Sequence, residues 1–270
     1  MIDKIKVARS FSRSAVTYDS VAYFQRDMGE ALLSLMSKTA SFSEGSPVCV
    51  DLGCGTGHFY SSLKSQYSGH QYVGIDIAEG MLQFVKQNIF TNKDEKNNQN
   101  DCLVCSDAEN LPLAKDSVNL LFSNLALQWC ESLPALFSEL HRVLAPGSVF
   151  AFTTLGPGTL QELKQSWKSV DDLVHVNHFL PASVWEEAIL QNDFTIECYQ
   201  QEGVILKYES VNTLLRELKL LGAHNVNDGQ RQTLTGRKRL TGLLAAYQKF
   251  FVDGYYPATY DVSFWVLKKF

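Results

Sequence analysis

Between residues 48 and 154, short apolar runs alternate with segments whose apolar residues recur every three or four positions. The runs predict strands and the segments between them predict helices, because the two periods are those of an extended and a helical backbone. The expected strands are Val48–Leu52, a run that ends at Asp76, Cys102–Cys105, Val118–Asn124 and Val149–Thr154. This alternation predicts a doubly wound α/β domain whose parallel strands carry ligand-binding loops at their carboxyl ends.

The pattern differs on either side of this core. Residues 7–38 have apolar positions at helical spacing, which predicts a helical N-terminal segment. After residue 155 the pattern is mainly helical to 192, strand-like over 194–208, helical over 214–221 and 240–251, and alternating over 260–267. No internal repeat is present, so we expect a single domain with a closing strand near residue 270.

The most specific local feature is Asp51-Leu52-Gly53-Cys54-Gly55-Thr56-Gly57, which joins the first strand to a helix, together with Asp76. Glycines at alternate positions let the backbone turn sharply and approach a ligand closely. Asp76 can accept hydrogen bonds from ribose hydroxyls, whereas Asp51 would repel a diphosphate and favours a cationic ligand. A glycine turn without a ligand would leave the second carboxylate unexplained. The stretch resembles motif I of class I methyltransferases, which bind S-adenosylmethionine with its sulfonium.

Composition and charge exclude other classes. The chain has 270 residues, of which 45% are hydrophobic, as in an ordinary soluble core. A net charge of −5 argues against general nucleic-acid binding, and the short apolar runs predict neither a signal peptide nor a membrane span. Six cysteines, mostly in apolar surroundings, indicate reduced thiols in a cytoplasmic protein. Cys102-x-x-Cys105 has no second ligand pair at a suitable spacing, so no metal site is expected.

Further motifs make the resemblance more specific. Asp107–Leu113 follows the third strand, where an acidic side chain can reach an adenine amino group, and Asn124–Cys130 follows the fourth. With these motifs the chain resembles the malonyl-acyl-carrier-protein O-methyltransferases of biotin synthesis over nearly its whole length. The other motifs that carry the resemblance are Val7–Ala15, Tyr18-Asp19, Gln25-Arg26, Phe152–Leu155, Gly158–Leu160, His175–Asn177, Leu214–Lys219, Gly222-Ala223, Leu234–Arg237, Ala246-Tyr247 and Tyr260.

The resemblance implies a Rossmann-like sheet of about seven strands, the last one antiparallel. It divides the single domain of residues 1–270 into an N-terminal helical lid (1–40), a cofactor-binding half (45–155) and a substrate-capping segment with the closing strands (156–270). The implied cofactor is S-adenosylmethionine. The residues expected to contact it are Tyr18, Gln25, Asp51, Gly53, Gly55, Asp76, Ile77, Met81, Asp107, Ala108 and Asn124. For Tyr18 and Gln25, plain helix packing is the alternative.

The implied reaction transfers a methyl group to the free carboxylate of a malonyl thioester and gives a methyl ester. A carboxylic acid with a pKa of about 4 is already ionised near neutral pH, so no general base is expected. Catalysis then depends on holding a carboxylate oxygen in line with the methyl group and on excluding water. Gln128 and Trp129 offer neutral N–H donors for that carboxylate. The alternative for Trp129 is a core aromatic residue.

Two further sets of residues concern the substrate and its carrier. His175 and Asn177 either line the acyl pocket or lie on the surface. The densest basic cluster is Arg231, Arg237, Lys238 and Arg239. Acyl carrier proteins are acidic, so Arg237 and Lys238 form either a docking surface or an ordinary solvated face. The expected partner is acyl carrier protein bearing malonyl, or malonyl-coenzyme A.

Other functions stay open on the sequence. A methyltransferase for another small acid such as aconitate, or a C-methyltransferase for a quinone precursor, would share the glycine turn. The second would be expected to need a base, and no carboxylate or histidine stands out for that task beside Asn124–Trp129. A non-catalytic adenosylmethionine-binding subunit is a third possibility, although the intact turn and both acidic residues, Asp51 and Asp76, speak against it.

Overall fold

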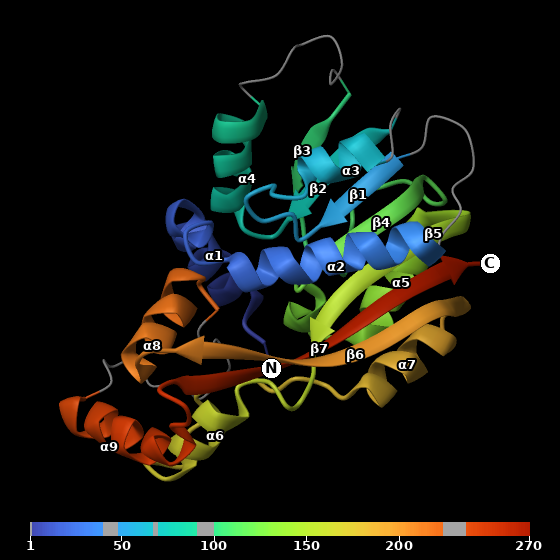
Figure 1. Cartoon of the computed structure of the whole chain (residues 1–270). Helices are drawn as coiled ribbons and strands as arrows, with labels where there is room; N and C mark the ends of the chain where they lie inside the picture. Colours follow the sequence, from blue (N-terminus) through green and yellow to red (C-terminus); the bar gives the residue numbers. More distant parts are fainter. Residues whose placement is uncertain (1, 40–47, 67–69, 91–99, 224–235) are drawn as a thin grey trace.

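A seven-stranded mixed sheet forms the centre of the molecule in the computed structural model, which describes residues 2–39, 48–66, 70–90, 100–223 and 236–270 (Figure 1). The strand order is β3-β2-β1-β4-β5-β7-β6, with β7 antiparallel to both of its neighbours. The strands are β1 (Val48–Leu52), β2 (Gln71–Asp76), β3 (Cys102–Cys105), β4 (Val118–Asn124), β5 (Leu144–Leu155), β6 (Phe194–Tyr208) and β7 (Tyr256–Lys269). The predicted doubly wound sheet with an antiparallel last strand is therefore confirmed.

Helices cover both faces of this sheet. The first two, α1 (Lys4–Tyr18) and α2 (Tyr23–Thr39), precede β1, and α2 packs along one face over β4, β5 and β7 (Figure 1). The opposite face carries α5 (Leu133–Val143), which packs on β5, and α7 (Ala182–Leu190), which packs on α5 and β6. The other helices are α3 (Tyr60–Gln66), α4 (Glu79–Val85), α6 (Gln161–Lys168), α8 (Val211–Leu220) and α9 (Arg237–Tyr247).

The apolar residues form one hydrophobic cluster on each face. Tyr72 and Cys49 face the cluster under α2, whereas the alternate residues Val73 and Val50 face the cluster under α5 and α7. Because β1 and β2 are covered on both faces, their sequences read as continuous apolar runs, as expected of buried parallel strands. The predicted bounds of β1, β3 and β4 agree with the structure.

Two of the predicted segments differ clearly from the structure. The fifth strand begins at Leu144 rather than Val149, because Leu144 already pairs with Val118 of β4. A register shift opposite Val118 and Leu120 accommodates the exposed Pro146 and Gly147 as an irregularity within the strand. The stretch 156–192, expected to be largely helical, contains two short helices, α6 and α7, with non-helical chain between them.

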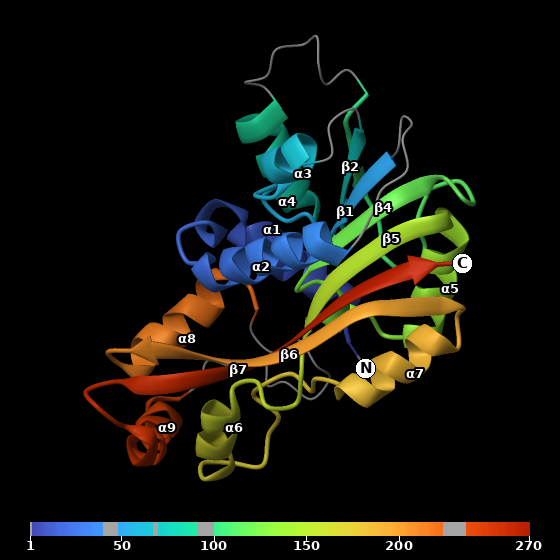
Figure 2. The ribbon, with the colours of Figure 1, turned by 45° about the vertical axis from the view of Figure 1, so that its right-hand side comes forward.

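The two longest strands carry the C-terminal part of the fold. β6 and β7 pair from Phe194 with Lys269 to Tyr208 with Tyr256, and their far ends project beyond the rest of the sheet (Figure 2). α8 packs on β6 and α6 packs on β7, while α9 packs on α6. Strands from both halves of the chain thus belong to one sheet, and its carboxyl edge is bordered by α1 and by the segments after β5.

A buried lysine closes the amino edge of this sheet. The Lys269 side chain is 5% exposed, and its ammonium group donates to the Asp116 carboxylate and to the carbonyls of His141 and Leu144, each at 2.7 Å. We expect Lys269→Met to lower the free energy of unfolding by about 1–3 kcal/mol, because it leaves the buried Leu144 carbonyl without its donor and removes the ion pair with the partly exposed Asp116. The adjacent Lys268 is exposed, so Lys268→Met should change it by less than about 0.5 kcal/mol. Urea denaturation measures both, and equal effects would contradict the assignment.

Candidate active site

A cleft lies at the carboxyl ends of β1, β2 and β4, where an open α/β sheet binds its ligands. It encloses about 750 Å³ of empty space, its solvent-open mouth included, within the size range of small-molecule sites. We call it the first cleft. Of the residues predicted to contact the cofactor, those that line it are Tyr18, Gly53, Gly55, Asp76, Ile77, Met81, Asp107, Ala108 and Asn124.

Asp51 and Gln25 line a smaller adjoining hollow instead. This side pocket shares Tyr18, Gly53, Gly55 and Asn124 with the first cleft, so the two spaces meet at the glycine turn. The structure therefore gathers all eleven predicted contact positions around one connected space.

The glycine turn brings two loops into contact. Gly53 has φ +77°, and a Cβ built on it would lie 2.2 Å from the Ala126 Cβ in the loop after β4. Its N–H donates to the Ile75 carbonyl at 2.7 Å, which ties the turn to β2. Gly55 has φ +52° with open space where a Cβ would stand. Gly53 is thus required by packing between loops, whereas Gly55 leaves backbone exposed to a ligand.

Two carboxylates lie beside this turn, the buried Asp51 and the half-buried Asp76. Asp76 accepts the N–H groups of Gly55 at 2.9 Å and Ala78 at 2.7 Å, while burial raises its pKa to about 6. Asp51 accepts the Tyr72 hydroxyl at 2.9 Å, and burial raises its pKa to about 7. Neither carboxylate has an ion-pair partner within the described part of the chain. Two acids that are withdrawn from solvent to this degree and lack a protein cation fit a ligand that brings positive charge and hydroxyl donors.

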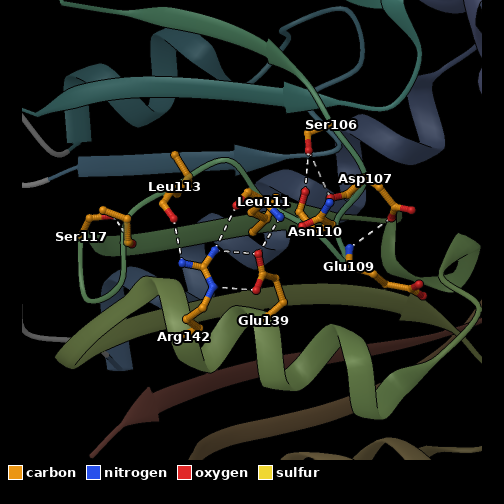
Figure 3. Close-up of polar contacts among 10 residues, drawn as sticks. Ser106, Asp107, Glu109, Asn110, Leu111, Leu113, Ser117, Glu139 and Arg142 are labelled. Carbon is orange, nitrogen blue, oxygen red and sulfur yellow. Dashed lines mark hydrogen bonds and ion pairs between the residues drawn. The ribbon is translucent and has the colours of Figure 1, made fainter.

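The loop after β3 is held by α5, as Figure 3 shows. Arg142 donates to the carbonyls of Leu113 at 2.8 Å and Leu111 at 3.0 Å, and Glu139 accepts the Leu111 N–H at 2.6 Å (Figure 3). The Arg142 guanidinium holds the pKa of Glu139 below its usual range. This ion pair fixes the backbone that presents Asp107 and Ala108 to the first cleft.

Asp107 is already engaged by the N-terminal helix. Lys4 Nζ lies 2.6 Å from Asp107 Oδ2 and 2.5 Å from Glu109 Oε2, and Asp107 Oδ1 accepts the Glu109 N–H at 3.1 Å. Each carboxylate oxygen can accept a second hydrogen bond, so the ion pair leaves room for the predicted contact with an adenine amino group. It also joins α1 to the far side of the cleft.

The sequence reasoning predicted an N-terminal helical lid but named only Tyr18 among the residues of α1 that contact the cleft. Lys4, Val7, Phe11 and Tyr18 all line the first cleft. Their separations of three, four and seven residues place them on one helix face. This helical spacing from Tyr18, a predicted cofactor contact, is the signal in the sequence that could have identified them. The other residues that line the first cleft were not named individually as cofactor contacts; they are Leu52, Ser106, Leu125, Ala126, Leu127 and Cys130.

Several contacts hold α1 over the cleft. Ser10 Oγ donates to the Gly222 carbonyl at 2.8 Å, which ties the middle of the helix to the end of α8. The Gly80 N–H donates to Ser12 Oγ at 3.1 Å, and a Cβ on Gly80 would lie 2.6 Å from the Ser12 carbonyl oxygen. Just after the helix, Thr56 in the glycine turn donates to Asp19 at 2.6 Å.

A second cleft adjoins the first, with about 580 Å³ of empty space including its open mouth. The two share Phe11, Tyr18, Leu125 and Trp129, which form the boundary between them. Its remaining lining residues are Phe24, Gln25, Gln128, Leu155, Thr159, Leu160, Asn177, Phe179, Leu218, Leu221, Ala223 and Tyr260. None of these described lining residues is charged, so the second cleft is apolar with a few neutral polar groups.

Of the two predicted catalytic residues, Trp129 lies at this boundary and Gln128 lies next to it in the second cleft. Trp129 lines both clefts and packs edge-on against Phe11, with ring centroids 5.5 Å apart. Gln128 lines the second cleft; its amide nitrogen donates to the Leu125 carbonyl at 2.7 Å, which leaves one N–H, and its buried oxygen has no partner in the described structure. Asn177 also lines the second cleft.

A hydrogen-bond chain links the boundary to α2. Asn124 Nδ2 donates to the Gln25 carbonyl at 2.8 Å, and Asn124 Oδ1 accepts the Thr153 hydroxyl at 2.8 Å. Thr153 in turn accepts the Leu125 N–H at 2.9 Å. The Asn124 side chain therefore contacts protein on both sides, which makes it a support of the boundary as well as part of the cleft lining.

The structure does not bring three of the predicted substrate residues into either cleft. His175 stacks on Trp167, with ring centroids 3.6 Å apart, and its Nε2 lies 2.7 Å from Asp171 Oδ1. It does not line the second cleft, so of the two alternatives for His175 the acyl pocket is not supported. Arg237 and Lys238 are exposed at the start of α9, and the neighbouring Arg239 lies 3.6 Å from Asp171. Arg231 lies outside the described residues.

The described residues form neither a metal-binding cluster nor a helix that could span a bilayer. No group of three or more His, Cys, Asp or Glu residues among them could hold a metal ion, and Cys102 and Cys105 are free thiols. Among the described helices, none combines the length and the hydropathy that a bilayer span requires.

The fold and the cleft define a class I methyltransferase. Residues 50–152 match a methyltransferase domain family. The YcgJ protein of Bacillus subtilis shares the fold with a TM-score of 0.61, at 17% identity over 89% of this chain and 98% of that one. Phosphoethanolamine N-methyltransferase 2 of Haemonchus contortus, solved with S-adenosylmethionine, has a TM-score of 0.59, at 18% identity over 96% of this chain and 57% of that one.

Curated relatives narrow the class. The malonyl-[acyl-carrier protein] O-methyltransferase of Gallionella capsiferriformans is 38% identical over 98% of this chain and 90% of its own length. The chain belongs to the malonyl-[acyl-carrier protein] O-methyltransferase family, and the predicted cofactor S-adenosylmethionine agrees with this membership. The biotin biosynthesis bifunctional protein BioHC of Cellvibrio japonicus is 41% identical over 99% of this chain. This chain spans only about half, 51%, of the length of BioHC.

Because Gly53 and Ala126 are in contact, a side chain at position 53 should disturb both clefts. We expect Gly53→Ala to weaken binding of S-adenosylhomocysteine at least about tenfold, or ~1.4 kcal/mol, since the loop after β4 must move. Gly147 has nearly the same φ, +78°, with open space around it at the amino edge of the sheet. Gly147→Ala therefore introduces similar backbone strain without a side-chain clash, and it should leave the binding of S-adenosylhomocysteine unchanged. Calorimetric titration measures both affinities, and a Gly53→Ala protein that binds normally would refute the packing argument.

Proposed function

We propose that this protein transfers the methyl group of S-adenosylmethionine to the free carboxylate of malonyl-acyl carrier protein and forms a methyl ester. The observation that carries the proposal is the pair of clefts: the first cleft and its side pocket present the unpaired carboxylates of Asp76 and Asp51, the second cleft is uncharged, and the two clefts share four boundary residues. The names of the family members given above support the same substrate. All six cysteines are free, which fits a cytoplasmic enzyme.

The first cleft and the side pocket would hold the cofactor. Asp76 would accept the ribose hydroxyls, and Ile77, Met81 and Ala108 would pack around the adenine, with Asp107 near its amino group. The buried carboxylate of Asp51, with Tyr18 and Gln25, lines the part of the site suited to the cationic amino-acid end. The bound cofactor supplies an electrophilic methyl group on a sulfonium.

In the second cleft, the protein would position the substrate carboxylate and exclude water from it. The malonyl carboxylate needs no base, because it is already ionised. The remaining N–H of Gln128 and the indole N–H of Trp129 are neutral donors at the boundary. They would orient the carboxylate while withdrawing less charge from the attacking oxygen than an arginine would. The apolar walls would exclude the water that otherwise solvates it.

Helix α1 would act as a lid. It forms a wall of both clefts and is tied down at Lys4, Ser10 and Ser12. Opening of some of these contacts would widen the way in for cofactor and substrate, and their reclosure would exclude water during transfer.

The carrier protein would dock beside the entrance through complementary charge. Arg237 and Lys238 are exposed on α9, where they are available to an acidic surface. Such a contact would speed encounter and would weaken as salt rises. Asn177, which lines the second cleft, would contact the acyl arm.

The decisive measurement is label transfer. With methyl-labelled cofactor, malonyl-acyl carrier protein should gain an alkali-labile methyl, malonyl-coenzyme A should do so less efficiently, and free diacids should gain little. Transfer only to another acid would redirect the assignment within the methyltransferases. Absence of transfer to every acceptor, with cofactor bound, would favour a non-catalytic binding subunit.

The same assay tests the boundary donor. Gln128→Ala should raise the KM for the malonyl substrate about tenfold, the loss of one charge-assisted hydrogen bond, with cofactor affinity retained. Gln200 lies exposed on β6, so Gln200→Ala is the matched control and should change neither value. Unchanged kinetics for Gln128→Ala would remove Gln128 from the proposal.

The lid has its own test at Lys4. Its side chain is 18% exposed and joins Asp107 and Glu109, whereas Lys6 on the same helix pairs with Asp3 at the surface and is 49% exposed. We expect Lys4→Met to speed cofactor dissociation roughly tenfold, because a partly buried ion pair is lost, and Lys6→Met to leave it unchanged. Stopped-flow displacement measures the rate. Equal rates in the two variants would show that this ion pair does not hold the lid.

A further inference from the structure

The backbone of the second cleft has an unusual feature. Five non-glycine residues in the described ranges have positive φ; three are aspartates, Asp116, Asp193 and Asp253, and two are leucines, Leu125 at +51° and Leu160 at +53°. Aspartate visits this region readily, whereas leucine rarely does. Both leucines line the second cleft. A leucine kept where glycine would be unstrained indicates that its side chain has a task there.

The two leucines occupy different parts of the cleft. Leu125 also lines the first cleft, so it belongs to the boundary where transfer would occur. Leu160 lines the second cleft only and is 6% exposed. It precedes α6 and comes from the chain after β5, in the segment that follows the cofactor-binding half.

Leu160 is held rigidly by β7. Its N–H donates to the Thr259 carbonyl at 2.6 Å, and the buried Glu162 accepts both the N–H of Thr259, at 3.0 Å, and its hydroxyl, at 2.5 Å. The preceding loop is tied to the same strand, since Asp261 accepts the Gly158 N–H at 3.1 Å. These four hydrogen bonds hold the backbone on both sides of Leu160 to β7, so the Leu160 side chain projects from a fixed position and forms a rigid part of the wall.

We propose that Leu160 determines acyl specificity by excluding groups bulkier than the unsubstituted malonyl chain. The inference rests on the proposed function. The carboxylate end of the acyl group would be held at the boundary and the thioester end by its carrier arm. With both ends held, an extra methyl branch or extra methylene groups must project sideways, against the apolar wall that Leu160 forms.

The experiment compares acyl groups rather than total activity. With wild-type protein, methylmalonyl and glutaryl thioesters should have kcat/KM values about ten- to a hundredfold below that of the malonyl thioester, the range for one or two carbons against a fitted wall. Leu160→Ala should raise the ratio of bulky to malonyl substrate at least about tenfold. Leu160→Gly, which suits the positive φ, should do the same without backbone strain.

Leu163 provides the matched control. It lies on α6, is 3% exposed and belongs to the same hydrophobic cluster, but it does not line the second cleft. Leu163→Ala should lower the melting temperature and leave the acyl ratio unchanged. If the Leu160 variants lower the melting temperature with no change in the ratio, Leu160 is a packing residue and the inference is wrong.

A binding measurement separates this inference from the proposed function. Calorimetry with protein loaded with S-adenosylhomocysteine gives the Kd of each acyl thioester, and the same ratio should rise in the Leu160 variants. If wild-type protein methylates no malonyl thioester but the Leu160 variants still raise the binding ratio, the proposed reaction is refuted and the role of Leu160 as a wall is supported. If wild-type protein methylates the malonyl thioester normally but the Leu160 variants leave the ratio unchanged, the proposed reaction stands and the inference about Leu160 is refuted.

Discussion

The contact between Gly53 and Ala126 is the constraint on which the site depends. One residue belongs to the turn after β1 and the other to the loop after β4, and there is no room between them for a methyl group. Their contact places the cofactor turn directly against the segment that carries Leu125, Gln128 and Trp129. Donor and acceptor spaces therefore share a wall, which is what a direct transfer between two bound groups requires. A larger residue at either position would separate them.

Charge is distributed to suit the two spaces. Around the glycine turn, burial holds two carboxylates at raised pKa values with no protein cation beside them in the described structure. A cationic ligand would favour their ionised forms, so its binding and their ionisation support each other. The second cleft has no charged lining residue among those described. An anionic substrate there would depend on neutral donors, and its reactivity is preserved because no strong counter-charge stabilises it in the ground state.

Rigidity and mobility are also divided between the walls. The walls formed by the chain after β4 and after β5 are fixed by backbone hydrogen bonds. The Leu125 N–H donates to the Thr153 hydroxyl oxygen, and the Leu160 N–H donates to the Thr259 carbonyl. Both leucines have positive φ, and such strain of about 1–3 kcal/mol persists only where neighbouring contacts impose it. The wall from α1 is held mainly by side-chain contacts to separate loops, with Lys4 bridging to Asp107 and Glu109. These contacts can open one by one, which suits a lid.

The sequence alone determined the sheet, the glycine turn and its two acids, because strand periodicity and glycine conformation are local properties. β1, β3 and β4 have the predicted bounds, and all eleven predicted cofactor positions surround one space. Only the tertiary structure decided that Lys4 would meet Asp107, that Gly53 would touch Ala126, and that His175 would stack on Trp167 rather than enter the second cleft. These are contacts between residues distant along the chain or set by packing, and no local pattern specifies which of many compatible side chains a fold brings together. The wall at Leu160 belongs to the same class, because its strained backbone is imposed by β7, almost a hundred residues later in the chain.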